Sequence, residues 1–312
     1  MSQHWRVVFM GTPGPAAATL EALLKSPDPV VGVVTQPDRP AGRGQQSTIS
    51  PVRRVAGVNH IPVLAPEKVR APPFLEALAS WQPDVIVVVA YGRILPRSVL
   101  ELAPQGCINV HYSLLPKYRG AAPIPWAIIN GETVSGVTTM RLVEAMDAGP
   151  IYLQEKVALS KDETAASLAA KMVPVGARLL LETIAGLKTG SVAPREQRQE
   201  DVTYARILKK EDGAINWHES AAVTERRVRA FYPWPSAYTH WQGKLLKIHR
   251  AAIVVTELTG ESGEVIRADA DGFWVATGAA VLSLEEVQMD NRKRLVASEF
   301  LTGARITKGA RL

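Results

Sequence analysis

The stretch Val85-Ile-Val-Val-Val89 (VIVVV) is a run of β-branched residues without a polar side chain. Strands that are apolar along their whole length are typical of a parallel sheet covered on both faces. Arg6-Val-Val-Phe-Met10 and Val30-Val-Gly-Val-Val34 have the same character. Helical patterns occupy 15–25 and 73–81, and each opens with a proline that suits a first helical turn. Strand and helix alternating in this way predict a doubly wound α/β domain.

The C-terminal third of the chain has a different pattern. An alanine- and leucine-rich helix is predicted over 164–186, and the polar stretch 188–210 indicates a connection between domains. A helix at 220–231 and then short alternating runs separated by turn residues predict a small β-barrel. The expected strands are 237–241, 245–249, 263–266, 272–276 and 280–284. We therefore predict two domains, 1–203 and 204–312, as the length of 312 residues favours.

Composition narrows the classes of function. The chain is 46% hydrophobic and 21% charged, and no apolar run approaches the roughly 18 to 20 residues of a membrane helix. The N-terminus lacks the pattern of a secretory signal, so we expect a cytoplasmic protein. A single cysteine, Cys107, excludes an internal disulfide and a cysteine-based zinc site. The 6 histidines are scattered without ligand spacing, and we expect no metal.

The charge of the chain permits a nucleic-acid partner. The net charge is +6 and the pI is about 9.4, values that allow an acidic partner without requiring one. The excess is locally concentrated over 37–55, where Asp38 is the lone acid among four arginines: Arg39, Arg43, Arg53 and Arg54.

The strand predicted around Cys107-Ile-Asn-Val-His111 carries two polar residues in an apolar run. Residues two apart in a strand share a face, so Asn109 and His111 project side by side. A second segment, Ala145-Met-Asp147-Ala-Gly149, places a lone carboxylate in a glycine-containing loop. If Asp147 reaches His111, it fixes the tautomer of the ring and stabilises its protonated form.

An imidazole and a carboxamide aimed at one spot suit acyl transfer to an amine. The carboxamide donates to the developing oxyanion, which is worth roughly 100- to 1000-fold in rate. The imidazole takes the proton of the amine, which contributes about 100- to 10000-fold, so that no serine or cysteine nucleophile is needed. From spacing alone, two structural polar residues are an equally open interpretation.

The motifs together resemble a known family. Asn109-Val-His111, Ser113-Leu-Leu-Pro116 and Arg119-Gly-Ala-Ala-Pro-Ile124, followed by Asp147, resemble the signature of folate-dependent formyltransferases. Other segments are similar to the methionyl-tRNA formyltransferase family within that group: Thr35-Gln-Pro-Asp-Arg-Pro-Ala-Gly-Arg-Gly44, Val87-Val-Val-Ala-Tyr-Gly92 and Ala230-Phe-Tyr-Pro-Trp-Pro235. The resemblance covers nearly the whole chain.

The resemblance implies a fold, a reaction and site residues. It implies a Rossmann-like formyltransferase domain followed by an OB-like tRNA-binding barrel, and formyl transfer from 10-formyltetrahydrofolate to the α-amino group of methionyl initiator tRNA. Asn109, His111 and Asp147 match the catalytic trio, and the loop with Arg39 and Arg43 matches the insertion that engages the acceptor end of the tRNA. The tetrahydrofolate-binding segment matches Ser113, Leu114, Leu115 and Pro116. We expect a monomer.

Several positions depart from the family pattern, and other functions stay open. The departures are Gly14, Pro15, Tyr112, Ala148 and Pro150. One alternative is a formyltransferase that acts on a small amine such as a nucleotide sugar, and another is a 10-formyltetrahydrofolate hydrolase. A third alternative is an RNA-binding protein without catalysis, in which Asn109 and His111 are structural.

Overall fold

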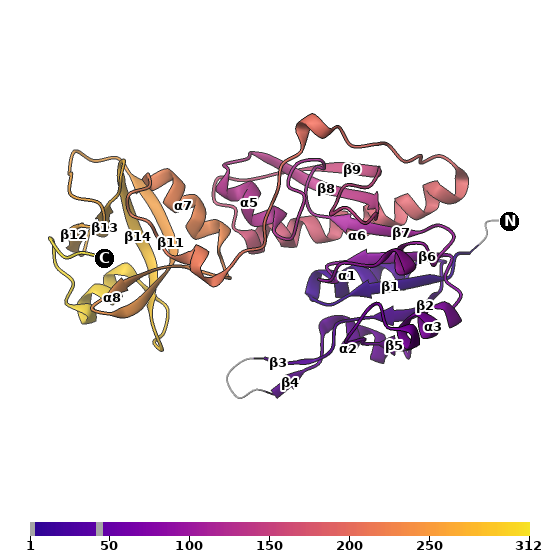
Figure 1. Cartoon of the computed structure of the whole chain (residues 1–312). Helices are drawn as coiled ribbons and strands as arrows, with labels where there is room; N and C mark the ends of the chain where they lie inside the picture. The colour runs from indigo at the N-terminus through magenta and orange to yellow at the C-terminus, as the bar shows by residue number, and fades with distance from the viewer. Residues whose placement is uncertain (1–3, 42–45) are drawn as a thin grey trace. The chain divides into compact units, whose positions relative to one another are not determined.

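The computed structural model describes residues 4–41 and 46–312 (Figure 1). The chain divides into two compact units. The first comprises Met1–Pro123, Val134–Ala158 and Ala169–Ala205, and the second comprises Ile124–Thr133, Leu159–Leu168 and Arg206–Leu312. The predicted fold class, a Rossmann-like α/β domain and a smaller antiparallel β domain, is confirmed. Within the described ranges, no helix is long and apolar enough to cross a membrane.

The first unit is built on a 7-stranded sheet of order β5-β2-β1-β6-β7-β8-β9. The first five strands in this order are mutually parallel, and β8 and β9 run antiparallel at the edge. The three apolar runs expected as strands are confirmed as β1, β2 and β6. The strands are β1 (Val7–Gly11), β2 (Val30–Val34), β5 (Val63–Leu64), β6 (Val85–Val89), β7 (Cys107–His111), β8 (Val134–Arg141) and β9 (Ile151–Ala158).

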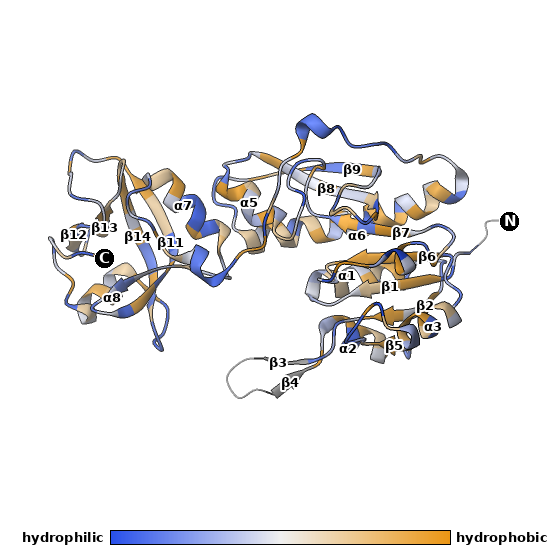
Figure 2. Ribbon diagram, viewed as in Figure 1, coloured by the Kyte–Doolittle hydropathy of each residue, from blue (hydrophilic) through white to orange (hydrophobic). Residues whose placement is uncertain are grey.

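Both faces of the central strands are covered, which is why these strands read as continuous apolar runs. Val8 and Ile86 belong to an apolar cluster that includes Leu78 of α3 (Pro72–Ser80). The opposite face meets α6 (Ala165–Thr189), where Val110 lies against Gly176. Figure 2 shows the hydrophobic colour of β1 and β6. Each fully buried aliphatic side chain contributes about 1.5–3 kcal/mol relative to its exposed state.

The other helices of this unit follow local start signals. The predicted helices at 15–25 and 73–81 are confirmed as α1 (Gly14–Leu23) and α3, and the predicted helix at 164–186 is α6. A helix that was not predicted, α2 (Pro51–Val58), begins where the Ser50 hydroxyl accepts a hydrogen bond from the Arg53 amide at 3.1 Å. A short helix, α4 (Arg97–Leu100), follows β6, and β3 (Arg39–Ala41) pairs with β4 (Gln46–Thr48) as a hairpin.

The second unit contains a 6-stranded antiparallel sheet of order β10-β11-β14-β13-β12, with β15 paired to β14. Register shifts near Arg250 bend β11, as strands of small barrels require. Phe273 stacks on Phe300 in its core, with ring centroids 6.1 Å apart. The elements are α5 (Pro123–Ile129), α7 (Ala221–Ala230), β10 (Ala237–Trp241), β11 (Lys244–Val254), β12 (Val265–Asp269), β13 (Gly272–Ala276), β14 (Val281–Met289), β15 (Leu295–Val296) and α8 (Ala297–Ala304).

Candidate active site

Strand β7 carries the first two candidate catalytic residues on one face. Alternation along the strand places Cys107, Asn109 and His111 on the same side, with Val110 on the other. Cys107 lies in the apolar cluster, where burial raises the pKa of its thiol to about 12. Asn109 and His111 are only 9% and 6% exposed. Two polar side chains therefore continue an otherwise apolar face at the carboxyl end of a central strand.

The His111 ring lies between a backbone carbonyl and a carboxylate. Its Nε2 donates a hydrogen bond to the Tyr118 carbonyl at 2.9 Å, because a carbonyl oxygen only accepts. Its Nδ1 is 3.7 Å from Oδ2 of Asp147, which confirms that the predicted carboxylate lies beside the ring. A neutral ring with hydrogen on Nε2 leaves Nδ1 to accept a proton, and the carboxylate then faces an imidazolium.

The Asp147 carboxylate is held by the backbone of another loop. Its Oδ2 accepts a hydrogen bond from the Gly120 amide at 2.8 Å. Asp147 has φ +48° and Tyr118 has φ +62°, so both partners of the histidine lie in the left-handed region. Such conformations cost about 1–3 kcal/mol each and occur at sites where surrounding contacts enforce them. Gly149 permits the turn, because a Cβ there would lie 1.9 Å from the Arg141 carbonyl oxygen.

Two buried polar residues at this loop were not identified by the sequence analysis. Gln197 is 6% exposed and Arg119 is 5% exposed. The Gln197 Nε2 donates to the carbonyl oxygens of Asp147 and Gly149 at 2.8 and 2.7 Å. Its Oε1 accepts from Nε and Nη2 of Arg119 at 3.0 and 2.8 Å. Arg119 belongs to the motif 119–124, in which no role was predicted for it. Gln197 belongs to the polar stretch 188–210, which was interpreted as a connection between domains.

The segment Ser113 to Pro116, expected to bind the folate, makes many hydrogen bonds with its own surroundings. The Ser113 hydroxyl donates to the Lys117 carbonyl at 2.6 Å, and the Thr138 hydroxyl donates to the Ser113 carbonyl at 2.6 Å. Leu115 is buried against Met140 and Ile151, whereas Leu114 and Pro116 are half-buried. The folate-binding role of this segment stays a prediction. Leu114 and Pro116 keep some exposed surface with which a ligand could make contact.

One of the two arginines predicted to contact tRNA lies on the β3–β4 hairpin. Arg39 begins β3, whereas Arg43 lies outside the described residues. Of the same basic stretch, Arg53 forms an ion pair with Asp38. The departure at Tyr112 does not narrow the catalytic face, because Tyr112 alternates with His111 and lies near Gly176 of α6. Burial raises the pKa of the Tyr112 hydroxyl to about 12.

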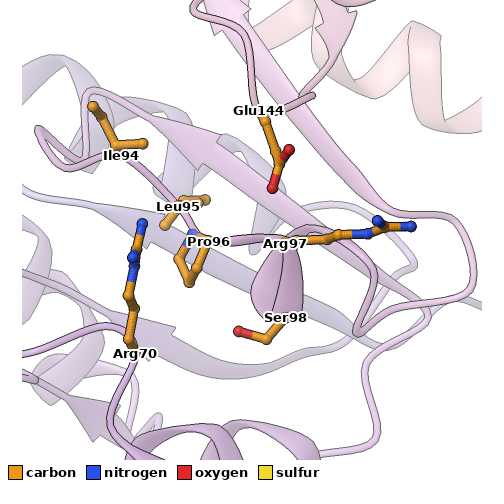
Figure 3. Close-up of a pocket in the computed structure, with 7 residues that line it drawn as sticks. All are labelled: Arg70, Ile94, Leu95, Pro96, Arg97, Ser98 and Glu144. Atoms are coloured by element: carbon orange, nitrogen blue, oxygen red, sulfur yellow. The ribbon is translucent and has the colours of Figure 1, made fainter.

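Two adjoining cavities border the loop that carries Asp147. One, of about 490 Å³, lies between the segment after β6 and Glu144 of that loop (Figure 3). The second, of about 690 Å³, shares Arg97 and Glu144 with the first and reaches Gly149. Ile94 and Met146 expose 70% and 58% of their surface beside this loop. Across the described residues, no group of His, Cys, Asp and Glu side chains could hold a metal ion.

Comparison with known sequences assigns the family. The family described as formyl transferase matches residues 5–184, and the family described as formyl transferase, C-terminal domain, matches residues 207–305. This chain belongs to the formyl transferase family. The site of this formyl transferase thus lies in the part of the chain that matches the first description.

Individual relatives of this formyl transferase are similar over nearly their whole length. A methionyl-tRNA formyltransferase of Desulfotalea psychrophila is 49% identical over 301 residues, which are 96% of this chain and 93% of the relative. One of Magnetococcus marinus is 47% identical over 308 residues, 99% of this chain and 98% of the relative. The resemblance predicted from the motifs is confirmed. An N-formyltransferase from Helicobacter canadensis has the same fold, with a TM-score of 0.64 over 91% of this chain and 99% of that chain at 19% identity.

Proposed function

We propose that this formyl transferase transfers the formyl group of 10-formyltetrahydrofolate to the α-amino group of methionyl initiator tRNA. The observation that carries the proposal is the identity of 49% and 47% to methionyl-tRNA formyltransferases across both units of the chain. The position of His111 between the Tyr118 carbonyl and the Asp147 carboxylate supports the same chemistry. The product is N-formylmethionyl-tRNA, which serves translation initiation.

The proposed reaction proceeds through a tetrahedral intermediate. The amine nitrogen attacks the formyl carbon, and the Asn109 carboxamide donates to the oxygen that gains negative charge. An α-amino group titrates near pH 8 and the neighbouring ester should lower that pKa, so much of the amine is already neutral at cellular pH, and His111 Nδ1 accepts the proton released on attack. Asp147 stabilises the resulting imidazolium. The bond between the formyl carbon and N10 of the folate then breaks, and N10 takes the proton back from His111.

The two adjoining cavities are the site that we propose for the co-substrate. Ala145, Ala148 and Gly149 of the loop that carries Asp147 line the second, and the exposed apolar surface of Ile94 in the first suits a flat aromatic ring. Ser113 to Pro116 line neither cavity, and we propose that the folate reaches them from the second cavity, because Leu114 and Pro116 are only half-buried. Asn109 and His111, at the carboxyl end of β7, then face the reacting carbon.

The tRNA is proposed to contact both parts of the chain. Arg39 and Arg43 engage its acceptor end, and residues 204–312 form an OB-like platform for the remainder, while 1–203 carry the chemistry. Because the catalytic trio comes from one copy of the chain, we propose a monomer. Since its acceptor is made and used during translation, we place the protein in the cytoplasm.

The direct test mixes the purified protein with 10-formyltetrahydrofolate and one acceptor at a time. Methionyl initiator tRNA is expected to be formylated, whereas uncharged tRNA and water are expected to give no turnover. Folate cleavage without product on tRNA would identify a hydrolase, and formylation of a nucleotide amino sugar in place of the tRNA would identify the small-amine reaction. Tight tRNA binding with no turnover would leave only the RNA-binding function.

The arginine loop is tested by the salt dependence of tRNA binding. A phosphate contact by Arg43 releases about one counterion, so Arg43→Ala is expected to lower the slope of log affinity against log salt by about one. Arg54→Ala, which removes an exposed arginine of α2 in the same basic stretch, serves as the matched control. Equal slopes for the Arg43 variant and the wild type would remove Arg43 from the interface.

A further inference from the structure

We propose that Gln197 is a positioning residue for formyl transfer, which holds the 147–149 turn so that the Asp147 carboxylate faces His111. The inference rests on the proposed function, because it assigns a role in the same reaction. Gln197 lies 50 residues beyond Asp147 in the sequence, outside every motif that carries the chemistry. Its role follows from four hydrogen bonds and from the strain of the turn that it contacts.

The orientation of the Gln197 amide is determined by its neighbours. Arg119 presents only donors, so its Nε and Nη2 require an acceptor, which is Oε1 of Gln197. The Nε2 group is thereby directed at the carbonyl oxygens of Asp147 and Gly149, which only accept. Both hydrogens of the amide are used, one on each side of Ala148. The arrangement satisfies every polar atom of a side chain that is 6% exposed.

These hydrogen bonds act on a turn that is strained. Asp147 has φ +48°, a conformation that costs about 1–3 kcal/mol for a residue other than glycine. Each buried hydrogen bond contributes about 1 kcal/mol, and two bonds from one side chain offset a cost of that size. Without them the turn is free to relax, and relaxation rotates the Asp147 side chain away from the 3.7 Å contact with His111.

The segment that contains Gln197 also holds the second partner of His111. The Tyr118 amide donates to the Thr203 hydroxyl at 2.8 Å, and the Arg119 amide donates to the Thr203 carbonyl at 2.9 Å. Tyr118 itself has φ +62°, and its carbonyl accepts from Nε2 of His111. Residues 197–203 thus support both groups that lie beside the His111 ring, which are the Tyr118 carbonyl and the Asp147 carboxylate. Gln197 is the residue of this segment that contacts the 147–149 turn.

The substitution that isolates this role is Gln197→Glu. The carboxylate keeps the shape of the side chain and still accepts from Arg119, but it cannot donate and it repels the two carbonyl oxygens. We expect kcat for methionyl-tRNA formylation to fall about 10- to 100-fold, as a misplacement near 1 Å of a catalytic group does. The KM for the tRNA should stay within about 3-fold, because the tRNA is proposed to contact neither Gln197 nor the 147–149 turn.

Gln199→Glu is the matched control. It makes the same chemical change two residues further on, at an exposed position, and we expect wild-type kinetics from it. Thermal unfolding of both variants accompanies the kinetics. If Gln197→Glu does not fold, Gln197→Met removes the same two donors with a side chain of similar length, and the same loss of kcat is expected.

A double-mutant cycle with Asp147→Asn separates positioning from general destabilisation. If Gln197 acts through the Asp147 carboxylate, adding Gln197→Glu to Asp147→Asn should lower kcat by less than about 3-fold. An equal loss in both backgrounds, or wild-type kcat in Gln197→Glu alone, would overturn the inference. Absence of formyl transfer by the wild type would instead overturn the proposed function, so the two failures are distinguishable.

Discussion

Replacing Asp147 by asparagine removes one charge from the proposed catalytic site and little else. The carboxamide oxygen of the new side chain can still accept the hydrogen bond that the Gly120 amide gives at 2.8 Å, so the loop keeps its anchor. The same oxygen is the atom that lies 3.7 Å from Nδ1 of His111, so the asparagine presents a neutral oxygen to the ring where the wild type presents a charged one. Asp147→Asn thus removes the negative charge that would stabilise a protonated His111.

The size of the effect follows from the distance and the burial of the pair. The His111 and Asp147 side chains are 7% and 14% exposed, and Nδ1 and Oδ2 are 3.7 Å apart. Two unit charges at about 4 Å attract by roughly 4 kcal/mol at an effective dielectric constant of about 20. In the proposed mechanism the imidazolium forms only during the reaction, so this attraction lowers the barrier, and its loss corresponds to roughly a 1000-fold fall in rate.

The assay is single-turnover transfer of a labelled formyl group to methionyl initiator tRNA with enzyme in excess. The dissociation constant of the folate, measured separately by fluorescence, should change by less than about 3-fold, because the charge acts on the reacting proton rather than on ground-state binding. A rate within about 10-fold of the wild type would refute the electrostatic role of Asp147. A large loss of folate affinity at an unchanged transfer rate would assign the residue to binding.

Three further predictions concern the folding of the chain. Gly149→Ala places a Cβ 1.9 Å from the Arg141 carbonyl oxygen, so both the transfer rate and the unfolding temperature should fall. Gly57→Ala, with nothing within 4 Å of its Cβ, should instead stabilise the chain to urea by about 0.5–1 kcal/mol; equal behaviour of the two variants would contradict the steric argument. The hydrogen bond from Arg206 lowers the pKa of Asp212 to about 2, so this pair stabilises the folded chain fully at pH 6 and progressively less as the pH falls toward 2. Arg206→Gln should therefore lower the free energy of unfolding in urea more at pH 6 than at pH 3, and an equal decrease at both pH values would argue against this pair. Burial raises the pKa of the Cys107 thiol to about 12, so a thiol reagent at pH 8 should react only after unfolding in urea, and rapid native reaction would show that the strand is accessible.

Strong local patterns accounted for much of the fold. The apolar run Val85-Ile-Val-Val-Val89 predicted a strand buried on both faces, and every residue of β6 is buried. The alternation of the C-terminal runs predicted the antiparallel sheet. The same period of two placed Asn109 and His111 on one face of β7. In each case the information lies within about ten residues of the element that it describes.

The parts of the site that were missed depend on contacts between distant segments. Gln197 reaches Asp147 and Gly149 through backbone carbonyls, and every residue has a carbonyl, so no side-chain pattern marks the contact. The Tyr118 carbonyl acts on His111 in the same way. The hairpin and α2 were missed because short elements carry too few residues for a period to emerge.

In the proposed mechanism His111 accepts the proton of the methionyl amine during formyl transfer. The most direct measurement compares single-turnover transfer of a labelled formyl group from 10-formyltetrahydrofolate to methionyl initiator tRNA by the wild type and by His111→Ala. We predict rapid transfer by the wild type and a loss of at least about 100-fold in the variant, with folate affinity nearly unchanged. Transfer by His111→Ala at a rate close to that of the wild type would contradict the account.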